Sequence, residues 1–264
     1  VAICTEWSCR CILKTPRLTH EVNVMTIALE VKSLSKNFGG LKAIDDMSFS
    51  LDDGGFTALI GPNGAGKTTC FNLLSGVLEP SAGGMLLHGQ SITSMPTHLR
   101  ARQGMGRTFQ IAATFRSMTV LENIEVALIA AKQDKFDATA LLDELGIAEH
   151  TDHIITELAY GDIKRVELAM ALASMPSVLL LDEPTAGMGA NERLSIMELI
   201  ARLARVRGTT VLFTEHDMDS VFGFAERILV MDQGQLIADG SPEDIRSNTH
   251  VQQIYLGDEA TLDA

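Results

Sequence analysis

The feature that most constrains this chain is a glycine-rich segment, which we call the glycine loop. It reads Gly61-Pro62-Asn63-Gly64-Ala65-Gly66-Lys67-Thr68. A mostly apolar, strand-like run at 56–60 precedes it, and a helical pattern follows from Lys67 to about Leu78. A strand, a glycine loop and a helix in this order predict a phosphate-binding loop rather than a chance glycine-rich turn. We expect every residue of the loop, and the following Thr69, to contact a bound nucleotide.

Each residue type in the glycine loop has a part in binding a nucleoside triphosphate. Gly61, Gly64 and Gly66 let the backbone curl so that its N–H groups point at the β-phosphate, aided by the start of a helix. Lys67 brings a full positive charge to the β- and γ-phosphate oxygens, and the Thr68 hydroxyl can ligate magnesium. The loop therefore predicts a magnesium–nucleoside triphosphate as ligand.

A second apolar strand ends in two carboxylates. The run 178–181 is Val-Leu-Leu-Leu, typical of a buried strand, and Asp182-Glu183-Pro184 follows it. We expect Asp182 to hold the metal, directly or through water, and Glu183 to orient the attacking water as general base. Alone, such a pair is usually a solvated turn. Together with the glycine loop, it completes the two halves of a phosphoryl-transfer site.

Short apolar strands alternate with helical segments along most of the chain. Strands are predicted at 27–31, 41–51, 56–60, 178–181, 210–214, 228–231 and, at an edge, 235–238. The first two pair as an antiparallel ribbon, and the pattern from about 114 to 158 is helical without a strong strand. A helix is predicted at 166–173. We therefore predict an α/β fold with three parts: a P-loop NTPase core with a mostly parallel sheet, an N-terminal antiparallel β subdomain, and a helical subdomain at about 111–174.

Composition excludes several classes of protein. Apolar residues at 46 % and charged residues at 21 % are ordinary for a globular chain of 264 residues. No run approaches the roughly 18 apolar residues that a membrane span needs. The formal net charge of −13 argues against a sequence-independent grip on nucleic acid, so we expect no nucleic-acid partner.

The first 24 residues differ from the rest of the chain. They contain the only tryptophan, Trp7, and three of the four cysteines, namely Cys4, Cys9 and Cys11. They lack the apolar core of a secretory signal, and Met25 stands just before the first predicted strand. We expect 1–24 to be either an unstructured leader or an upstream mis-start. A metal-binding Cys-x-Cys pair is the less favoured alternative, because no second pair or histidine cluster accompanies it.

From about Ile27 onward the chain resembles the ATPases of ATP-binding cassette (ABC) transporters, with 25–264 as one cassette. Five further segments stand in the family's order around the glycine loop and Asp182-Glu183. They are Phe38, Gln110 within Gly106-Arg107-Thr108-Phe109-Gln110, Leu158-Ala159-Tyr160-Gly161-Asp162, Ala186-Gly187-Met188-Gly189, and His216. The joint order and spacing carry the resemblance, since each segment taken singly is weak.

The resemblance implies roles for these residues, with ATP as substrate and Mg²⁺ as cofactor. Phe38 takes the position of the aromatic side chain that stacks on adenine. Gln110 matches a glutamine that senses magnesium and the γ-phosphate, and His216 matches a histidine that contacts the γ-phosphate. The implied catalytic residues are Glu183, His216 and Gln110. The implied metal ligands are Thr68, Gln110 and Asp182.

The segment Leu158–Asp162, which we call the signature segment, departs from the family pattern Leu-Ser-Gly-Gly-Gln. In the family this segment faces the ATP of a second subunit. The residues expected to do so here are Ala159, Tyr160, Gly161 and Asp162. Because Ala159 has no hydroxyl, the backbone N–H groups at the following helix start must carry more of the anion contact. Gly189 stands where the family has an aspartate, which implies weaker communication between the two sites.

The residues that depart from the general family pattern are similar to those of one branch of the family. That branch is the ATPases of branched-chain amino acid importers, including related amide and urea carriers, and within it the LivG-like subunits. The segments that carry this likeness, besides the signature segment and Arg107-Thr108-Phe109-Gln110, are Met118-Thr119-Val120-Leu121-Glu122-Asn123, Glu215-His216-Asp217-Met218 and Tyr255-Leu256-Gly257.

The branch implies partners and a location. We expect a second ABC ATPase subunit (in a homo- or heterodimer), two membrane permease subunits, and an extracytoplasmic solute-binding protein that acts indirectly. The helical insertion would form the groove for a permease helix. The chain would lie at the cytoplasmic face of the inner (plasma) membrane, held there by the permeases.

Two other functions explain the sequence less well. A soluble ABC ATPase of translation or DNA repair would bring two cassettes or a long coiled coil, together with a basic surface, and none is seen. A small-molecule kinase built on the same loop leaves the signature segment and His216 unexplained. The transport ATPase is therefore the favoured function.

Overall fold

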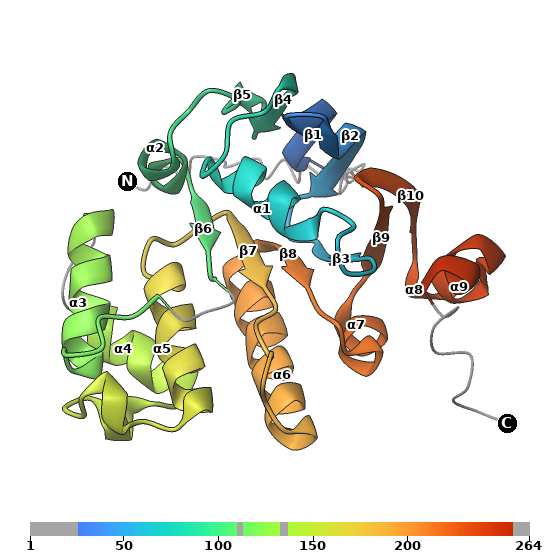
Figure 1. The fold of residues 1–264 in the computed structure, drawn as a ribbon. Coiled ribbons are helices and arrows are strands. Elements are labelled where there is room, and N and C mark those ends of the chain that lie inside the picture. The colour runs from blue at the N-terminus through green and yellow to red at the C-terminus, as the bar shows by residue number, and fades with distance from the viewer. Residues whose placement is uncertain (1–25, 110–112, 133–136, 256–264) are drawn as a thin grey trace, which may run out of the picture.

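The computed structural model describes residues 26–109, 113–132 and 137–255. These residues form two β-sheets with helices packed between and around them (Figure 1). Two of the sequence-based predictions lie outside the described residues: the leader or mis-start at 1–24, with its cysteines, and Gln110.

The larger sheet has six strands. In spatial order they are β10 (Gln235–Gly240), β9 (Arg227–Asp232), β3 (Phe56–Ile60), β8 (Thr210–Thr214), β7 (Val178–Asp182) and β6 (Met105–Arg107). All neighbours are parallel except β10 and β9. Every residue of β3, β7 and β8 is buried, because helices cover both faces, and this is why they read as short continuous apolar runs. The predicted mostly parallel sheet with an edge strand at 235–238 is confirmed, and the structure shows that this edge strand is antiparallel to its neighbour.

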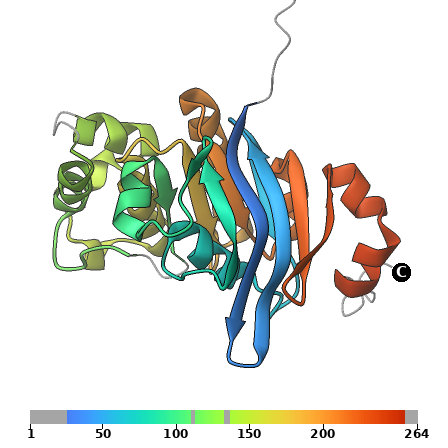
Figure 2. The ribbon, with the colours of Figure 1, turned by 90° about the horizontal axis from the view of Figure 1, so that it is seen from above.

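The smaller sheet is antiparallel and has four strands. In spatial order they are β2 (Leu41–Asp52), β1 (Ile27–Phe38), β4 (Ala82–Leu87) and β5 (Gln90–Ser91). The predicted ribbon of the first two strands is confirmed, and Figure 2 shows it as a long hairpin. The sequence did not predict β5 or β6, which have only 2 and 3 residues, nor β4, which begins with Ala-Gly-Gly and so lacks strand propensity.

Helices cover both faces and both ends of the larger sheet. They are α1 (Lys67–Ser75), α2 (Thr97–Arg102), α3 (Val120–Ala131), α4 (Asp137–Leu145), α5 (Tyr160–Leu172), α6 (Ala190–Arg207), α7 (Met218–Phe224), α8 (Pro242–Ser247) and α9 (Thr249–Tyr255). α3, α4 and α5 gather beyond β6, whereas α8 and α9 lie at the opposite end (Figures 1 and 2). The helical subdomain boundaries of 111–174 stay a prediction. No helix in the described ranges is long and apolar enough to cross a membrane.

Two helix boundaries were predicted wrongly. α1 ends at Ser75 rather than near Leu78, because Gly76 adopts a φ of 79° and its N–H caps the Leu73 carbonyl. α5 begins at Tyr160 rather than Val166, so Tyr160, Gly161 and Asp162 of the signature segment form its first turn, whereas Leu158 and Ala159 precede the helix.

Alternate residues of the parallel strands face two separate cores. Leu59 and Leu180 pack with α1 and the antiparallel sheet on one side. Ala58, Leu179 and Phe213 pack with α5 and α6 on the other. α1 therefore lies between the two sheets (Figure 1), which fixes the helix that starts in the glycine loop.

Arg100, on α2, closes the C-terminal end of α1. It is 2 % exposed, and its Nη1 donates to the carbonyls of Leu73 and Leu74, both at 2.6 Å. Its Nε donates to the Met95 carbonyl at 2.7 Å and its Nη2 to that of Thr93 at 3.0 Å. Burial lowers the pKa of this guanidinium. The last carbonyls of a helix have no partner within it, and a cation there is favourable. One side chain thus ties α2 to α1.

Arg100→Ala should lower the free energy of unfolding by about 2–4 kcal/mol, because several buried carbonyls would lose the hydrogen bonds that this side chain donates. Urea denaturation followed by circular dichroism measures this loss. The matched control is Arg102→Ala, at an exposed arginine of the same helix, which should change stability by no more than about 0.5 kcal/mol. Equal losses in the two variants would contradict the capping role of Arg100.

Candidate functional site

The candidate site lies where the carboxyl ends of β3, β7 and β8 meet at one edge of the larger sheet. In an open parallel sheet, ligands bind outside this edge. A pocket of about 630 Å³ opens there. The predicted site residues that line it are Phe38, Asn63, Gly64, Ala65, Gly66, Lys67, Thr68, Thr69, Glu183 and His216. The structure therefore brings together segments that are up to 178 positions apart in the sequence, from Phe38 to His216.

The glycine loop is packed too closely for side chains at two of its glycines. A Cβ atom on Gly61 would lie 2.2 Å from the carbonyl oxygen of Met231. Gly66 has a φ of 107°, and a Cβ there would lie 2.7 Å from the carbonyl oxygen of Ala43. The predicted need for glycine is thus a need for close backbone packing as well as for curvature.

Lys67 is held inside the glycine loop. It is 8 % exposed, and its Nζ donates to the carbonyls of Gly61 at 2.5 Å and Pro62 at 3.2 Å. Burial lowers the pKa of this ammonium, and the charges of Glu183 and Asp182 oppose that shift. Gly61 and Pro62 do not line the pocket themselves but position the lysine that does.

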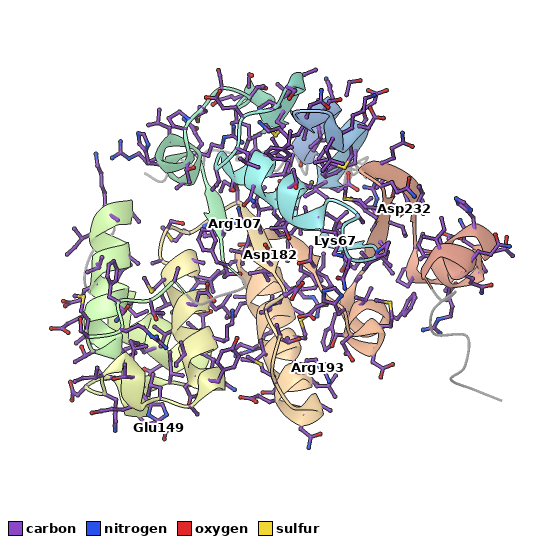
Figure 3. The ribbon with its side chains drawn as sticks, viewed as in Figure 1. Lys67, Arg107, Glu149, Asp182, Arg193 and Asp232 are labelled. Carbon is purple, nitrogen blue, oxygen red and sulfur yellow. The ribbon has the colours of Figure 1, made fainter. Side chains whose placement is uncertain are left out.

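Asp182 lies behind the pocket wall with its carboxylate held from two sides. It is 5 % exposed. Its Oδ1 accepts from the Thr214 hydroxyl at 3.0 Å. Its Oδ2 accepts from Arg107 Nη2 at 3.3 Å, and Figure 3 labels Asp182 and Arg107 next to each other on the neighbouring strands β7 and β6. The predicted metal ligand is thus fixed in orientation before any metal arrives.

Arg107, which the sequence shows only as a member of the segment Gly106–Gln110, connects several parts of the site. Its Nη1 donates to the Ser75 hydroxyl at 2.6 Å and to Asn72 Oδ1 at 2.8 Å, both on α1. Its guanidinium carbon lies 4.7 Å from the ring centroid of Phe109. Burial lowers its pKa, whereas the charge of Asp182 opposes the shift. Arg107 therefore joins the helix of the glycine loop to the end of β7.

Glu183 and His216 are in direct contact, which the sequence did not predict. Glu183 Oε1 lies 2.8 Å from His216 Nε2. Glu183 also has a φ of 49°, in the left-handed region, which costs about 1–3 kcal/mol for a residue other than glycine. Its N–H donates to the Thr214 hydroxyl at 3.0 Å and so helps to hold this conformation. Strain of this kind clusters at functional sites.

The pocket rim contains residues that the sequence analysis predicted and others that it missed. Phe38 is 45 % exposed, as an aromatic platform must be, and the Lys36 ammonium lies 5.2 Å from its ring centroid. Gln233 and Gly234 were missed. The Gly234 N–H donates to the Ala65 carbonyl at 2.9 Å, so this turn supports the glycine loop. In the sequence, the only indication of these two residues is that they form a turn between two predicted strands.

The signature segment does not line the pocket of its own chain. Ala159 and Tyr160 are exposed at the start of α5. Gly161 is buried, and a Cβ there would lie 1.8 Å from Glu192 Oε1, so the carboxylate of α6 rests against this glycine. Asp162 is half-buried. No sequence pattern indicates Glu192, and the predicted contact of the segment with a partner's ATP stays a prediction.

The glycine loop, the two strand-end carboxylates and the P-loop sheet order define the class: a P-loop ATPase. A family model described as "ABC transporter" matches residues 44–186, and one described as "Branched-chain amino acid ATP-binding cassette transporter" matches residues 235–261. The chain belongs to the ABC transporter family, in which it is an ATP-binding cassette.

This chain aligns with nearly the whole length of several known relatives. The high-affinity branched-chain amino acid transport ATP-binding protein LivG of Escherichia coli (strain K12) is 40 % identical over 249 residues, which are 87 % of this chain and 98 % of LivG. The lipopolysaccharide export system ATP-binding protein LptB of the same strain is 36 % identical over 239 residues, 89 % of this chain and 99 % of LptB. The crystal structure of the ADP conformation of MJ1267, an ATP-binding cassette of an ABC transporter, superposes with a TM-score of 0.80 at 30 % identity, covering 88 % of this chain and 99 % of MJ1267.

Cys70, directly after Thr69, should resist thiol reagents in the folded protein. It is fully buried, and burial raises the pKa of its thiol from 9.0 to about 12. The folded state keeps this proton between those pH values while the unfolded chain loses it, so this contribution to stability falls as pH rises through that window. Mass spectrometry of alkylated peptides should show Cys70 unlabelled at pH 9 without urea and labelled with it. Equal labelling in both conditions would contradict this burial.

Proposed function

We propose that this chain is the ATP-hydrolysing subunit of an importer for branched-chain or related amino acids. The observation that carries the ATPase site is the convergence of Lys67, Glu183 and His216 on one pocket, with Asp182 held behind it. The cargo class rests on the 40 % identity to LivG and on the C-terminal family match at 235–261.

ATP binding begins at the glycine loop. The Lys67 ammonium can exchange its hydrogen bonds to the carbonyls of Gly61 and Pro62 for bonds to phosphate oxygens. The N–H groups of the loop and the start of α1 add further donors for the phosphates. Phe38 at the rim takes the adenine by stacking.

Magnesium fits the donors beside the glycine loop. Thr68 lines the pocket, and the Asp182 carboxylate is fixed close behind it. Thr68, Asp182 and Gln110 would hold the ion, a hard-oxygen set of the kind that magnesium prefers together with phosphates. Bound magnesium would neutralise charge that develops on the transferred phosphoryl group.

Hydrolysis needs a base and a group that orients it. Glu183 accepts a proton from the attacking water on a carboxylate oxygen, and its left-handed backbone turns that carboxylate into the pocket. His216 Nε2, 2.8 Å from Glu183 Oε1, orients the carboxylate and lies at the pocket wall where a γ-phosphate would be. Gln110 would complete the set.

The remaining half of the site comes from a second ATPase subunit, whose signature segment presents the start of α5. Two membrane permeases would dock on exposed apolar side chains near the helical subdomain, among them Phe109, Phe115 and Ile129. A solute-binding protein would act on the permeases from the other side of the membrane. The chain would then lie at the cytoplasmic face of the inner membrane, bound through its permeases.

A second candidate cargo is lipopolysaccharide, favoured by the 36 % identity to LptB. The cassette itself does not touch the cargo in either reading, so the two share the same ATP chemistry. They differ in the direction of transport, and uptake experiments separate them.

Glu183→Gln should bind ATP with near-wild-type affinity but hydrolyse it at least about 100-fold more slowly, because the amide cannot accept the proton of the attacking water. Phosphate release by the purified transporter measures the rate, and size-exclusion chromatography with ATP should show a closed dimer. Lys67→Ala is the contrasting variant, since it should lose nucleotide binding itself. Undiminished turnover in Glu183→Gln would remove Glu183 as the base.

Deleting the gene should abolish energy-dependent uptake of labelled leucine, isoleucine and valine, and the wild-type chain should restore it. Glu183→Gln should not restore uptake although it is made in equal amounts. Normal amino-acid uptake in the deletion strain, with a changed outer surface instead, would overturn the amino-acid assignment in favour of export.

A further inference from the structure

A buried carboxylate stands directly before His216 and has no part in the mechanism above. It belongs to Glu215, which is 3 % exposed and lies between β8, ending at Thr214, and α7. A glutamate is rarely buried this deeply unless hydrogen-bond donors or opposite charges surround its carboxylate. The donors that Glu215 binds therefore indicate what it is for.

Glu215 binds the turn that follows β7. Its Oε1 accepts from the Thr185 N–H at 2.9 Å and from the Thr185 hydroxyl at 2.6 Å. Thr185 is 1 % exposed, so both hydrogen bonds lie inside the protein. Burial raises the pKa of the Glu215 carboxyl, and the donors on Thr185 oppose that shift. Two hydrogen bonds that meet on one oxygen thus join the turn after β7 to the loop after β8.

These hydrogen bonds lie beside Glu183 and His216, which we call the catalytic pair. Thr185 comes two residues after Glu183, and Glu215 comes one residue before His216. The Glu183 backbone has a φ of 49°, and its carbonyl accepts from the Ala186 N–H at 3.2 Å. A strained conformation persists only where its surroundings over-determine it. Thr185 and Glu215 add such a constraint, because they hold the turn and the loop at a fixed separation.

We propose that Thr185 and Glu215 are positioning residues for the catalytic pair. Their hydrogen bonds fix the two chain segments that carry the pair, and this keeps Glu183 Oε1 at 2.8 Å from His216 Nε2. Neither Thr185 nor Glu215 lines the nucleotide pocket, so both act through the pair. The proposal rests on the proposed function, because it takes Glu183 as the base of ATP hydrolysis.

The competing explanation is that these hydrogen bonds only stabilise the fold. The same two strands offer a matched control at the opposite edge of the sheet, where the Thr209 hydroxyl donates to the Pro176 carbonyl at 3.0 Å. Thr209 is 2 % exposed and precedes β8, and Pro176 precedes β7. Thr185→Val and Thr209→Val therefore each remove one buried hydroxyl hydrogen bond between segments that flank β7 and β8. Only the first lies beside the catalytic pair.

The test measures ATP hydrolysis by the purified transporter over a range of ATP concentrations. Thr185→Val and Glu215→Ala should lower kcat about 10-fold or more while KM stays within about 2-fold. The reason is that a slightly displaced base loses rate, whereas ATP still binds at the glycine loop. Thr209→Val should lower the melting temperature about as much as Thr185→Val does and keep the wild-type kcat.

Glu215→Gln tests whether hydrogen bonding carries the effect. The amide oxygen of glutamine can still accept from the Thr185 N–H and hydroxyl, so this variant should restore most of the kcat that Glu215→Ala loses. Thr185→Val carries the test if Glu215→Ala does not fold. Three results overturn the proposal: wild-type kcat in Thr185→Val, an equal loss of kcat in Thr209→Val, or no recovery in Glu215→Gln.

Glu183→Gln separates this proposal from the proposed function. In a Glu183→Gln background, Thr185→Val should lower the residual rate by less than about 3-fold, because the base that it positions is already lost. A full further loss there overturns the positioning proposal. If Glu183→Gln alone is slow and Thr185→Val alone is not, the positioning proposal is wrong and the role of Glu183 stands. If Glu183→Gln keeps its turnover, both assignments are overturned.

Discussion

Parallel pairing of β3, β8 and β7 is the constraint on which the rest of the site depends. In a parallel array the carboxyl ends of all strands open at the same edge, so the glycine loop, Glu183 and His216 become neighbours through main-chain hydrogen bonds alone. Continuous burial of the three strands fixes this arrangement, because no residue along them can turn toward water without leaving the core. Side chains then refine a geometry that the backbone has already set.

Buried cationic side chains then fix the exact positions of the segments around the site. Arg100 satisfies the end of α1, Arg107 joins α1 to Asp182, and Lys67 fills the glycine loop. Arg100 and Lys67 donate to backbone carbonyls and so fix segments of main chain, whereas Arg107 donates mainly to side chains of α1 and to Asp182. The net charge of −13 does not indicate these buried cations, because composition does not distinguish a buried arginine or lysine from an exposed one.

The sequence predicted those parts of the fold that depend on local pattern. The strands of the parallel sheet, the glycine loop and the Asp182-Glu183 strand end were predictable because burial and turn chemistry leave a direct trace in residue type. The short strands β4 to β6 and the pair Lys164–Glu167 were not. Two opposite charges three residues apart on a helix are usually solvated, whereas Lys164 and Glu167 are both buried, 3.1 Å apart, and hydrogen-bonded to the backbone of Phe109. The contact of Glu183 with His216 was equally invisible, because it joins two separate strand ends.

α5 begins at the signature segment and continues without a break past Glu167. With a rise of 1.5 Å per residue, Gly161 and Glu167 lie about 9 Å apart along one stiff rod. Glu167 accepts from the Phe109 N–H at 2.8 Å, so this helix joins the signature segment to the backbone that follows β6. The helix therefore connects the two places as one rigid element. A rigid shift of such a helix needs no local unfolding, and shifts of packed helices take place within microseconds to milliseconds.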